Sequence, residues 1–267
     1  MPRIIGIVSG KGGVGKTTFV SNLAIALSYL GQKVIVVDCN ITTPHLSYYL
    51  GIKQFSTSLN DVLMGKVDII HAPTYYRNIV CIPASQNLTD ITRVDITDLK
   101  KYISRLAKDN YDIILLDSAP GLGREAMSVL QSCNEIIFIT TPTIPNLSDA
   151  TRCAEVANKM QPKKFNIVLN MVRNKKYELN LEEANNFFSL PILGTIPFDT
   201  SVIDSTALGT PILWDKPDSR IGKKYQEIAR NLIGMNLITY EERETIFSTL
   251  FNEFKKLFGG KSKRPFE

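Results

Sequence analysis

The sequence predicts an α/β protein with a mainly parallel central sheet of about seven to eight strands, flanked by helices in a three-layer αβα arrangement. Short apolar runs alternate with helix-length segments along the chain. These runs are continuous and do not alternate with polar residues, which is typical of strands buried on both faces of a parallel sheet. A glycine-rich loop also follows the first run and precedes the first helix-length segment. With 267 residues, the chain is long enough for one such domain with a large core.

The expected strands follow one another at Ile4–Val8, Lys33–Asp38, Ile79–Pro83, Asp112–Asp117, Glu135–Thr140, Phe165–Asn170 and Ile192–Pro197. Between the first two, apolar residues recur at helical spacing before Gly31, where we expect the helix to end: Val20, Leu23, Ala24, Leu27 and Leu30. The alternation of strands and helices ends after about Ile238. We therefore expect one α/β domain over residues 1–238 and a separate C-terminal segment over residues 239–267.

The loop Gly10–Thr18, with the sequence GKGGVGKTT, matches the phosphate-binding pattern G-x-x-x-x-G-K-[ST]. The backbone N–H groups of such a loop converge on an anion, and the helix behind them adds the positive end of its dipole. Lys16 is expected to reach the β- and γ-phosphates, and the Thr17 hydroxyl to bind Mg²⁺. The predicted nucleotide-binding residues of this loop are Gly10, Lys11, Gly12, Gly13, Val14, Gly15, Lys16, Thr17 and Thr18. The sequence thus predicts a nucleotide site with Mg²⁺, and the family resemblance described below implies ATP and ADP as the nucleotides.

Two aspartates end predicted strands at the same edge of the sheet as this loop. Asp38 ends the run VIVVD, and Asp117 ends YDIILLD, which has the Walker B arrangement. In open α/β sheets, ligands bind at the carboxyl ends of the strands, so we expect both carboxylates to lie beside the phosphate-binding loop. Asp117 is expected to hold Mg²⁺ directly or through water. Asp38 is a second candidate for contact with the metal through water.

Lys11 extends the loop motif to K-G-G-x-G-K-T, which resembles the deviant Walker A motif of the ParA/MinD family of P-loop NTPases. The resemblance implies an ATP-sandwich homodimer in which Lys11 reaches the partner's ATP. It also implies slow ATP hydrolysis that an unidentified regulatory protein accelerates, with Asp38 activating the attacking water. The segment Ser118–Ala126 resembles the second switch of the family. Asn40 departs from the family's common Asp-x-Asp pattern and loses the charge, so either a water-mediated contact with the metal or the coupling of the switch is expected to be weaker.

Residues outside the loop and the two aspartates have less specific patterns. The family resemblance implies that Asn170 bonds the adenine edge and that backbone near Pro197 completes the pocket, whereas a turn-capping role for Asn170 remains an alternative. His45 and His71 have no partners at metal-binding spacing, so we interpret both as structural. Trp214 is expected to be a packing anchor. Four widely spaced cysteines are expected to be buried thiols in a reducing compartment: Cys39, Cys81, Cys133 and Cys153.

The C-terminal segment has an amphipathic pattern. Placed on a helical wheel, its apolar residues span an arc of about 140°: Ile246, Phe247, Leu250, Phe251, Phe254, Leu257 and Phe258. Lys255 and Lys256 lie outside this arc, and a basic run follows at residues 261–264. Such a helix suits reversible binding to an anionic membrane surface, and FKKLFGG resembles the membrane-targeting end of bacterial members of the MinD branch. The alternative is a final helix that docks on its own domain.

Charge and hydropathy restrict the class of partner. The net charge of +5 is accounted for by the basic residues of the tail, so binding of the core to nucleic acid is not expected. No apolar run is long enough for a signal peptide or a spanning helix. We expect a cytoplasmic protein that is peripheral on the inner face of the membrane when bound to ATP. The family resemblance implies that it places the division site or another cellular structure. The rival hypotheses are a ParA-like DNA-partitioning ATPase, an Mrp-type iron–sulfur carrier or scaffold, and a nucleotide sensor that does not hydrolyse ATP.

Overall fold

The computed structural model describes residues 1–91, 94–160, 164–188 and 190–235. Its centre is an eight-stranded sheet with the strand order β3-β4-β2-β5-β1-β6-β7-β8. The strands are β1 (Arg3–Val8), β2 (Val34–Asp38), β3 (Thr74–Tyr76), β4 (Ile79–Ile82), β5 (Ile113–Asp117), β6 (Glu135–Thr140), β7 (Lys164–Val172) and β8 (Ile192–Pro197). All neighbouring strands pair in parallel except β3 and β4, which are antiparallel. The predicted fold class is therefore confirmed.

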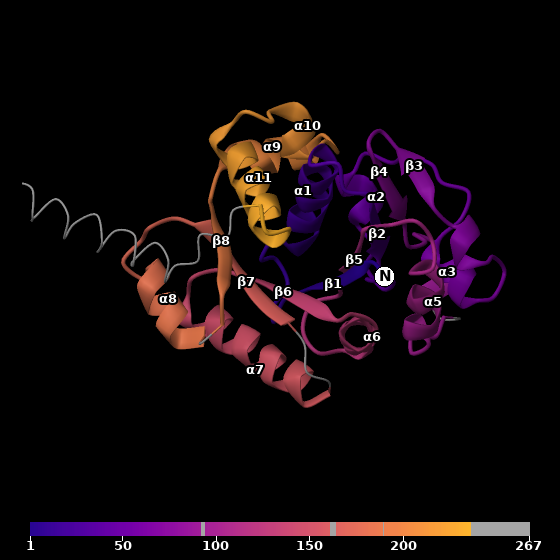
Figure 1. Ribbon diagram of the computed structural model, residues 1–267, viewed down its shortest axis with the longest axis horizontal. Helices are drawn as coiled ribbons and strands as arrows, with labels where there is room; N and C mark the ends of the chain where they lie inside the picture. The colour runs from indigo at the N-terminus through magenta and orange to yellow at the C-terminus, as the bar shows by residue number, and fades with distance from the viewer. Residues whose placement is uncertain (92–93, 161–163, 189, 236–267) are drawn as a thin grey trace, which may run out of the picture. The chain divides into compact units, whose positions relative to one another are not determined.

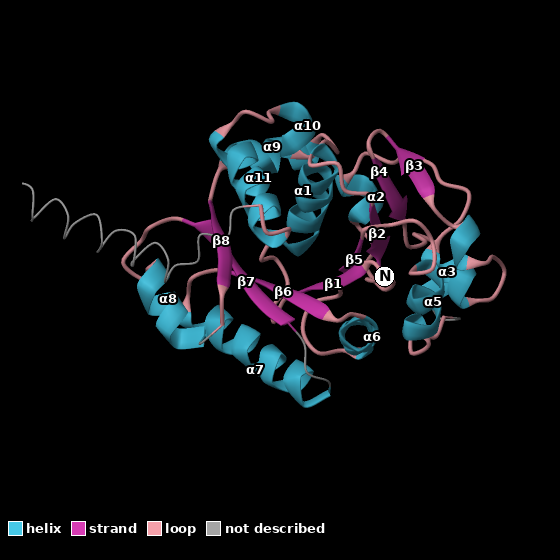
Figure 2. Ribbon diagram, in the orientation of Figure 1, coloured by secondary structure: helices cyan, strands magenta, loops and turns pink. Residues whose placement is uncertain are grey.

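Helices cover both faces of the sheet (Figures 1 and 2). One face carries α1 (Lys16–Tyr29), α9 (Thr200–Ala207), α10 (Ile212–Asp215) and α11 (Arg220–Leu232). The opposite face carries α5 (Leu99–Leu106), α6 (Arg124–Ser132), α7 (Ile144–Met160) and α8 (Leu181–Phe188). Shorter segments connect the strands: α2 (Leu46–Tyr49), α3 (Leu59–Leu63), η1 (Ile69–His71) and α4 (Leu88–Ile91). The sheet is thus the middle of three layers.

The continuous apolar runs become fully buried central strands. Every residue of β2 and β5 is buried, as expected for strands covered by helices on both faces. The predicted helix that ends near Gly31 is α1, and Gly31 has a φ of +78°, which favours glycine. Strand β7 continues two residues beyond Asn170. The sequence pattern did not reveal β3, because its three residues are too few to show a period.

The strand register sets the chemistry of one edge of the sheet. Asp38 at the end of β2 lies directly opposite Asp117 at the end of β5, and Asp117 is in turn the partner of Ile7 in β1. The loop after β1 therefore begins next to both carboxylates. Three adjacent strands thus deliver the predicted loop and the two predicted aspartates to the same place, as the general rule for parallel sheets requires.

The antiparallel hairpin at the sheet edge is fixed to α10 by aromatic and polar contacts. The guanidinium of Arg77 lies 4.5 Å from the centre of the Trp214 ring, and the rings of Tyr76 and Trp214 meet edge to face at 5.8 Å. Trp214 Nε1 donates a hydrogen bond to Asn78 Oδ1 at 2.9 Å. These contacts confirm the prediction that Trp214 is a packing anchor.

Within the described residues the chain forms a compact unit over Met1–Arg230, followed by a second unit that begins at Asn231. The predicted boundary after about Ile238 and the predicted amphipathic helix lie outside the described residues. No helix in the described part of the chain is long and apolar enough to cross a membrane. All four cysteines are buried, and no disulfide joins them.

Candidate functional site

A cavity of about 620 Å³ opens at the carboxyl edge of the sheet, beside the loop between β1 and α1. Its wall includes most of the predicted loop: Lys11, Gly12, Gly13, Val14, Gly15, Lys16, Thr17 and Thr18. The opposite part of the wall comes from the ends of β7 and β8, from α9 and from the loop after β2. This volume lies in the range of small-molecule and cofactor sites. The cavity is therefore large enough for a nucleotide whose phosphates face the loop.

Two loop glycines are required by close packing. A Cβ on Gly10 would lie 2.6 Å from the Cβ and 2.8 Å from the backbone carbon of Asp149 in α7. Gly15 precedes α1 with a φ of +85°, and a Cβ there would lie 2.4 Å from Asn170 Nδ2. The loop is thus held between α7 and the end of β7. These contacts add a packing requirement to the tight turns and the phosphate binding that the glycine-rich motif predicts for this loop.

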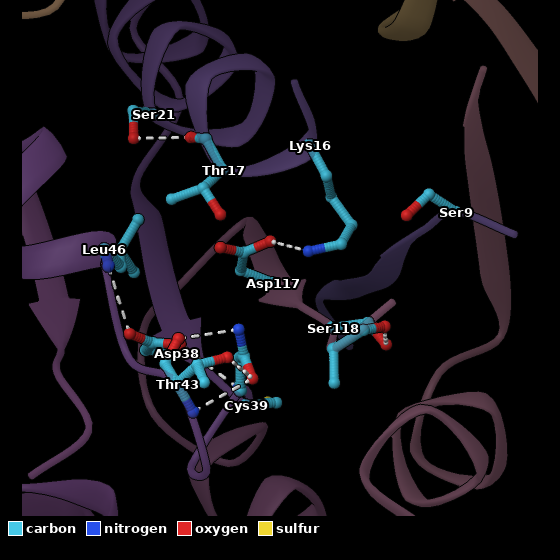
Figure 3. A network of polar contacts seen from close by, with 12 residues as sticks. Ser9, Lys16, Thr17, Ser21, Asp38, Cys39, Thr43, Leu46, Asp117 and Ser118 are labelled. Atoms are coloured by element: carbon cyan, nitrogen blue, oxygen red, sulfur yellow. Dashed lines mark hydrogen bonds and ion pairs between the residues drawn. The ribbon is translucent and has the colours of Figure 1, made fainter. Parts of the chain in front are cut away.

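Lys16 forms a buried ion pair with Asp117. Its Nζ lies 3.1 Å from Asp117 Oδ1, and only 7% of Lys16 and 1% of Asp117 are exposed. Figure 3 shows the Lys16 amine and the Thr17 hydroxyl both turned toward Asp117. Lys16 and Thr17 lie in the first turn of α1, where orphan backbone N–H groups add to the positive potential. The expected phosphate ligand, metal ligand and Walker B carboxylate therefore meet within one small space.

Asp38 is held by the backbone on both of its oxygens. Asp38 Oδ1 accepts from Asn40 N and Oδ2 accepts from Leu46 N, each at 3.1 Å (Figure 3). Burial, followed by repulsion from the neighbouring carboxylate of Asp117, raises the pKa of Asp38 to about 8. A carboxyl group with a pKa near neutral pH is suited to exchange protons with water during a reaction.

The oxygen-rich composition of this edge suits Mg²⁺. Mg²⁺ prefers one or two carboxylates together with phosphate and water oxygens, and Thr17, Asp38 and Asp117 provide hydroxyl and carboxylate oxygens here. No group of three or more His, Cys, Asp or Glu side chains capable of holding a metal occurs among the described residues. The donor set therefore fits a metal held jointly with phosphates better than a metal held by protein alone.

Lys11 lies at the open side of the cavity and contacts α7. Its Nζ is 3.4 Å from Asp149 Oδ2, and about half of its side chain is exposed. Unlike Lys16, Lys11 does not point into the buried ion-pair cluster. Its solvent-facing position leaves it free to interact with groups outside its own site once the contact with Asp149 is broken.

Asn170 and Pro197, the predicted adenine-site residues, both line the cavity. The Asn170 side chain is almost completely buried, and its Nδ2 donates to the carbonyl oxygen of Val14 at 2.8 Å. Asn170 therefore also clamps the phosphate-binding loop, a role that the sequence did not reveal. Asp199 lies in the same wall and caps α9 by accepting from Ser201 N at 2.9 Å.

Several residues of the cavity wall were not predicted from the sequence. His45 and Tyr49 line the cavity from the loop after β2 and from α2, and His45 precedes α2 without capping it through its side chain. His45 was expected to be structural, and the structure adds that it lies in the cavity wall. Phe198, which follows β8, forms part of the wall. The Arg173 guanidinium lies over its ring, 4.1 Å from the ring centre. Only the proximity of these positions to strand ends could have suggested them.

Comparison with known proteins shows which family this chain belongs to. A family model described as "ParA: NUBPL iron-transfer P-loop NTPase" matches residues 1–233. The chain belongs to the ParA/MinD family of P-loop ATPases. Among curated ParA/MinD proteins, the septum site-determining protein MinD of Synechocystis is 31% identical over 269 residues, covering 97% of this chain and 100% of that protein.

Two solved ParA/MinD ATPases share the fold. MinD of Pyrococcus horikoshii, complexed with Mg-ADP, aligns with a TM-score of 0.83 and 34% identity over 87% of this chain and 96% of that chain. MinD in the MinC:MinD complex of Aquifex aeolicus aligns with a TM-score of 0.80 and 26% identity over 89% of this chain and 98% of that chain. The predicted family is therefore confirmed, and MinD proteins are among the relatives.

Proposed function

We propose that this ParA/MinD ATPase hydrolyses ATP to ADP and phosphate as an ATP-dependent homodimer. The observation that carries the proposal is the convergence of Lys16, Thr17, Asp38 and Asp117 beside a cavity of about 620 Å³. The P. horikoshii relative was solved with Mg-ADP, which supports ATP, ADP and Mg²⁺ as the ligands. Bound Mg²⁺ would neutralise the charge that develops on the phosphates.

The residues of this chain have separate roles in the proposed reaction. Lys16 and the loop N–H groups bind phosphate oxygens, which requires Lys16 to exchange Asp117 for the nucleotide. Thr17 and Asp117 hold the metal, and Asp38 orients the attacking water and accepts its proton. The raised pKa of Asp38 supports this last role, because a base with a pKa near the working pH is effective.

Dimerisation assigns a function to Lys11. We expect it to leave Asp149 and reach the phosphates bound by the partner, as the family motif implies. The contact with Asp149 is half exposed and 3.4 Å long, so breaking it costs less than about 1 kcal/mol. The ion pair within one chain is therefore weak enough to be replaced.

The ATP-bound dimer is proposed to bind an anionic membrane surface through residues 239–267, which lie outside the described residues. Their apolar face and basic run support this role: each cation near an anionic leaflet contributes about 1 kcal/mol, and two tails on one dimer add through avidity. Hydrolysis would then separate the tails and release the protein. This cycle suits a spatial switch that positions a division site or another cellular structure.

A regulatory protein is expected to control the cycle. The A. aeolicus relative was solved as a MinC:MinD complex, which supports a protein partner of some kind. The rival hypothesis of an iron–sulfur carrier is supported by the matching family model, which is described as that of an iron-transfer P-loop NTPase. Against it, all four cysteines are buried, and the sequence contains no closely spaced pair of them. The rival DNA-partitioning role requires DNA binding that weakens steeply with salt.

The test measures dimer formation, phosphate release and liposome sedimentation with ATP, with ADP and without nucleotide. We expect ATP alone to give dimers and membrane binding, and deletion of residues 246–267 to abolish sedimentation without changing phosphate release. Equal sedimentation with ATP and ADP would refute the switch. DNA binding in place of liposome binding would favour the partitioning role.

A further inference from the structure

The loop from Cys39 to His45, called here the β2 loop, connects β2 to α2 and contributes Asn40, Thr43 and His45 to the cavity wall. Backbone N–H groups near both ends of this loop donate hydrogen bonds to Asp38. The N–H of Asn40 near its start donates to one oxygen of Asp38, and the N–H of Leu46 just after its end donates to the other. The conformation of the β2 loop therefore sets the orientation of the Asp38 carboxyl group.

Asn40 ties the β2 loop to itself. Its Nδ2 donates to the carbonyl oxygen of Thr43 at 2.7 Å, and its Oδ1 accepts from Thr43 Oγ1 at 3.0 Å. An aspartate could supply the second bond but not the first, because a carboxylate has no hydrogen to donate. It would place a negative oxygen against the Thr43 carbonyl oxygen. The local structure of this loop therefore requires the amide of Asn40.

Glu125 ties the same loop to a different element. Its Oε1 accepts from the backbone N of Thr42 at 2.8 Å and from Thr42 Oγ1 at 2.7 Å. Glu125 lies in the first turn of α6, where the helix dipole favours a negative charge. Helix α6 follows the segment that begins after Asp117, so one carboxylate joins the loop after β2 to the helix after β5.

We propose that Glu125 and Asn40 are positioning residues that hold the β2 loop so that Asp38 is correctly oriented for hydrolysis. Asn40 fixes the loop from within, and Glu125 anchors it to α6, so movement of the segment after Asp117 is transmitted to Asp38. The inference rests on the proposed ATP hydrolysis but goes beyond it, because it assigns the alignment of Asp38 to two residues outside the phosphate-binding loop.

The first experiment measures kcat and KM of the full chain with ATP and Mg²⁺, together with the Kd of a fluorescent ADP analogue. Glu125→Ala is expected to lower kcat by about tenfold, the loss that follows when a hydrogen bond to a charged group is removed, with little change in Kd. Glu125→Gln keeps the acceptor oxygen and is expected to recover most of kcat. Asn40→Asp is expected to lower kcat, because the carboxylate cannot donate to the Thr43 carbonyl oxygen. If Asn40 were only a less effective replacement for the family's second aspartate, the same substitution would raise kcat.

Glu183→Ala provides a matched control. Like Glu125, Glu183 lies in the first turn of a helix and accepts a hydrogen bond from a backbone N–H, here that of Asn180. Glu183 lies in α8, and its substitution is expected to leave kcat unchanged. A kcat of Glu125→Ala within twofold of the unsubstituted protein, or a higher kcat of Asn40→Asp, would overturn the proposal.

The second experiment does not depend on hydrolysis. Amide hydrogen exchange of the nucleotide-free protein is expected to become at least about tenfold faster at Asn40, Thr42 and Leu46 in Glu125→Ala, since local opening exposes these donors. Glu125→Gln should restore much of the protection. Unchanged exchange would refute the anchoring role even if the protein hydrolyses ATP. Faster exchange in a protein without ATPase activity would instead refute the proposed function while keeping the anchor.

Discussion

The buried pair of Lys16 and Asp117 makes a sharp prediction about stability. Replacing Lys16 by Met removes the cation and leaves the carboxylates of Asp117 and Asp38 opposite each other on adjacent strands. Removing one partner of a buried ion pair typically costs about 3–5 kcal/mol. At about 2–4 °C per kcal/mol for a chain of this size, the melting temperature should fall by roughly 6–20 °C.

The loss should depend on pH. At low pH one of the two facing carboxyl groups takes up a proton, which removes the repulsion between the two carboxylates, so the destabilisation by Lys16→Met should be smaller at pH 5.5 than at pH 8.5. Adding Asp117→Asn to the variant replaces one of the two facing carboxylates by a neutral amide and should restore much of the stability. The assay is thermal unfolding followed by circular dichroism, in EDTA and without nucleotide.

Lys224→Met is the matched control, because Lys224 pairs with Glu227 at 2.7 Å on the surface of α11. A partly exposed pair of this kind contributes only about 1 kcal/mol or less, so the control should unfold close to the unsubstituted protein. The electrostatic reasoning fails if Lys16→Met costs no more than this control at pH 8.5, or if the double substitution is no more stable than Lys16→Met alone.

Three further predictions follow from the site. Lys11→Ala should keep the affinity for ADP but abolish ATP-dependent dimers in analytical ultracentrifugation; dimers that persist would contradict the proposed role of Lys11. Because burial raises the pKa of Asp38 to about 8, the native state holds a proton that the unfolded chain has lost above about pH 4. The free energy of unfolding should therefore decrease from pH 4 to 8, and Asp38→Asn should reduce this slope in urea titrations. Asn170→Ala removes the clamp on Val14 and should weaken ADP binding by about tenfold; equal affinity in calorimetry would show that the loop holds its shape without it.

Much of the fold could be predicted because its causes are local. Continuous apolar runs predict strands buried on both faces, and the positions of Asp38 and Asp117 at the ends of two such runs placed them at one edge before their register was known. The loop motif likewise carries its chemistry in adjacent residues. These features need no knowledge of which strand lies beside which.

The remaining features depend on contacts between residues far apart in the sequence. The clamp from Asn170 to Val14 joins positions 156 residues apart, and the anchor from Glu125 to Thr42 joins positions 83 apart. Neither contact is marked by a periodic pattern or a motif in the sequence. The same applies to Gly10, whose lack of a side chain is explained by the backbone of Asp149. From the sequence, Asn40 was interpreted only as the loss of a family aspartate. Its hydrogen bond to the Thr43 carbonyl oxygen could not be predicted, because it depends on the conformation of the loop.

Trp214 is the only tryptophan of the chain, and its place beside Arg77 makes it a natural optical reporter. Helix α1 is about 21 Å long, at 1.5 Å per residue. It starts at Lys16 in the nucleotide site, and Tyr29 at its other end donates to the carbonyl oxygen of Leu213, the neighbour of Trp214. A shift of this helix on nucleotide binding would alter the surroundings of the indole ring. The intrinsic fluorescence of the unlabelled protein can therefore follow events at the opposite end of α1.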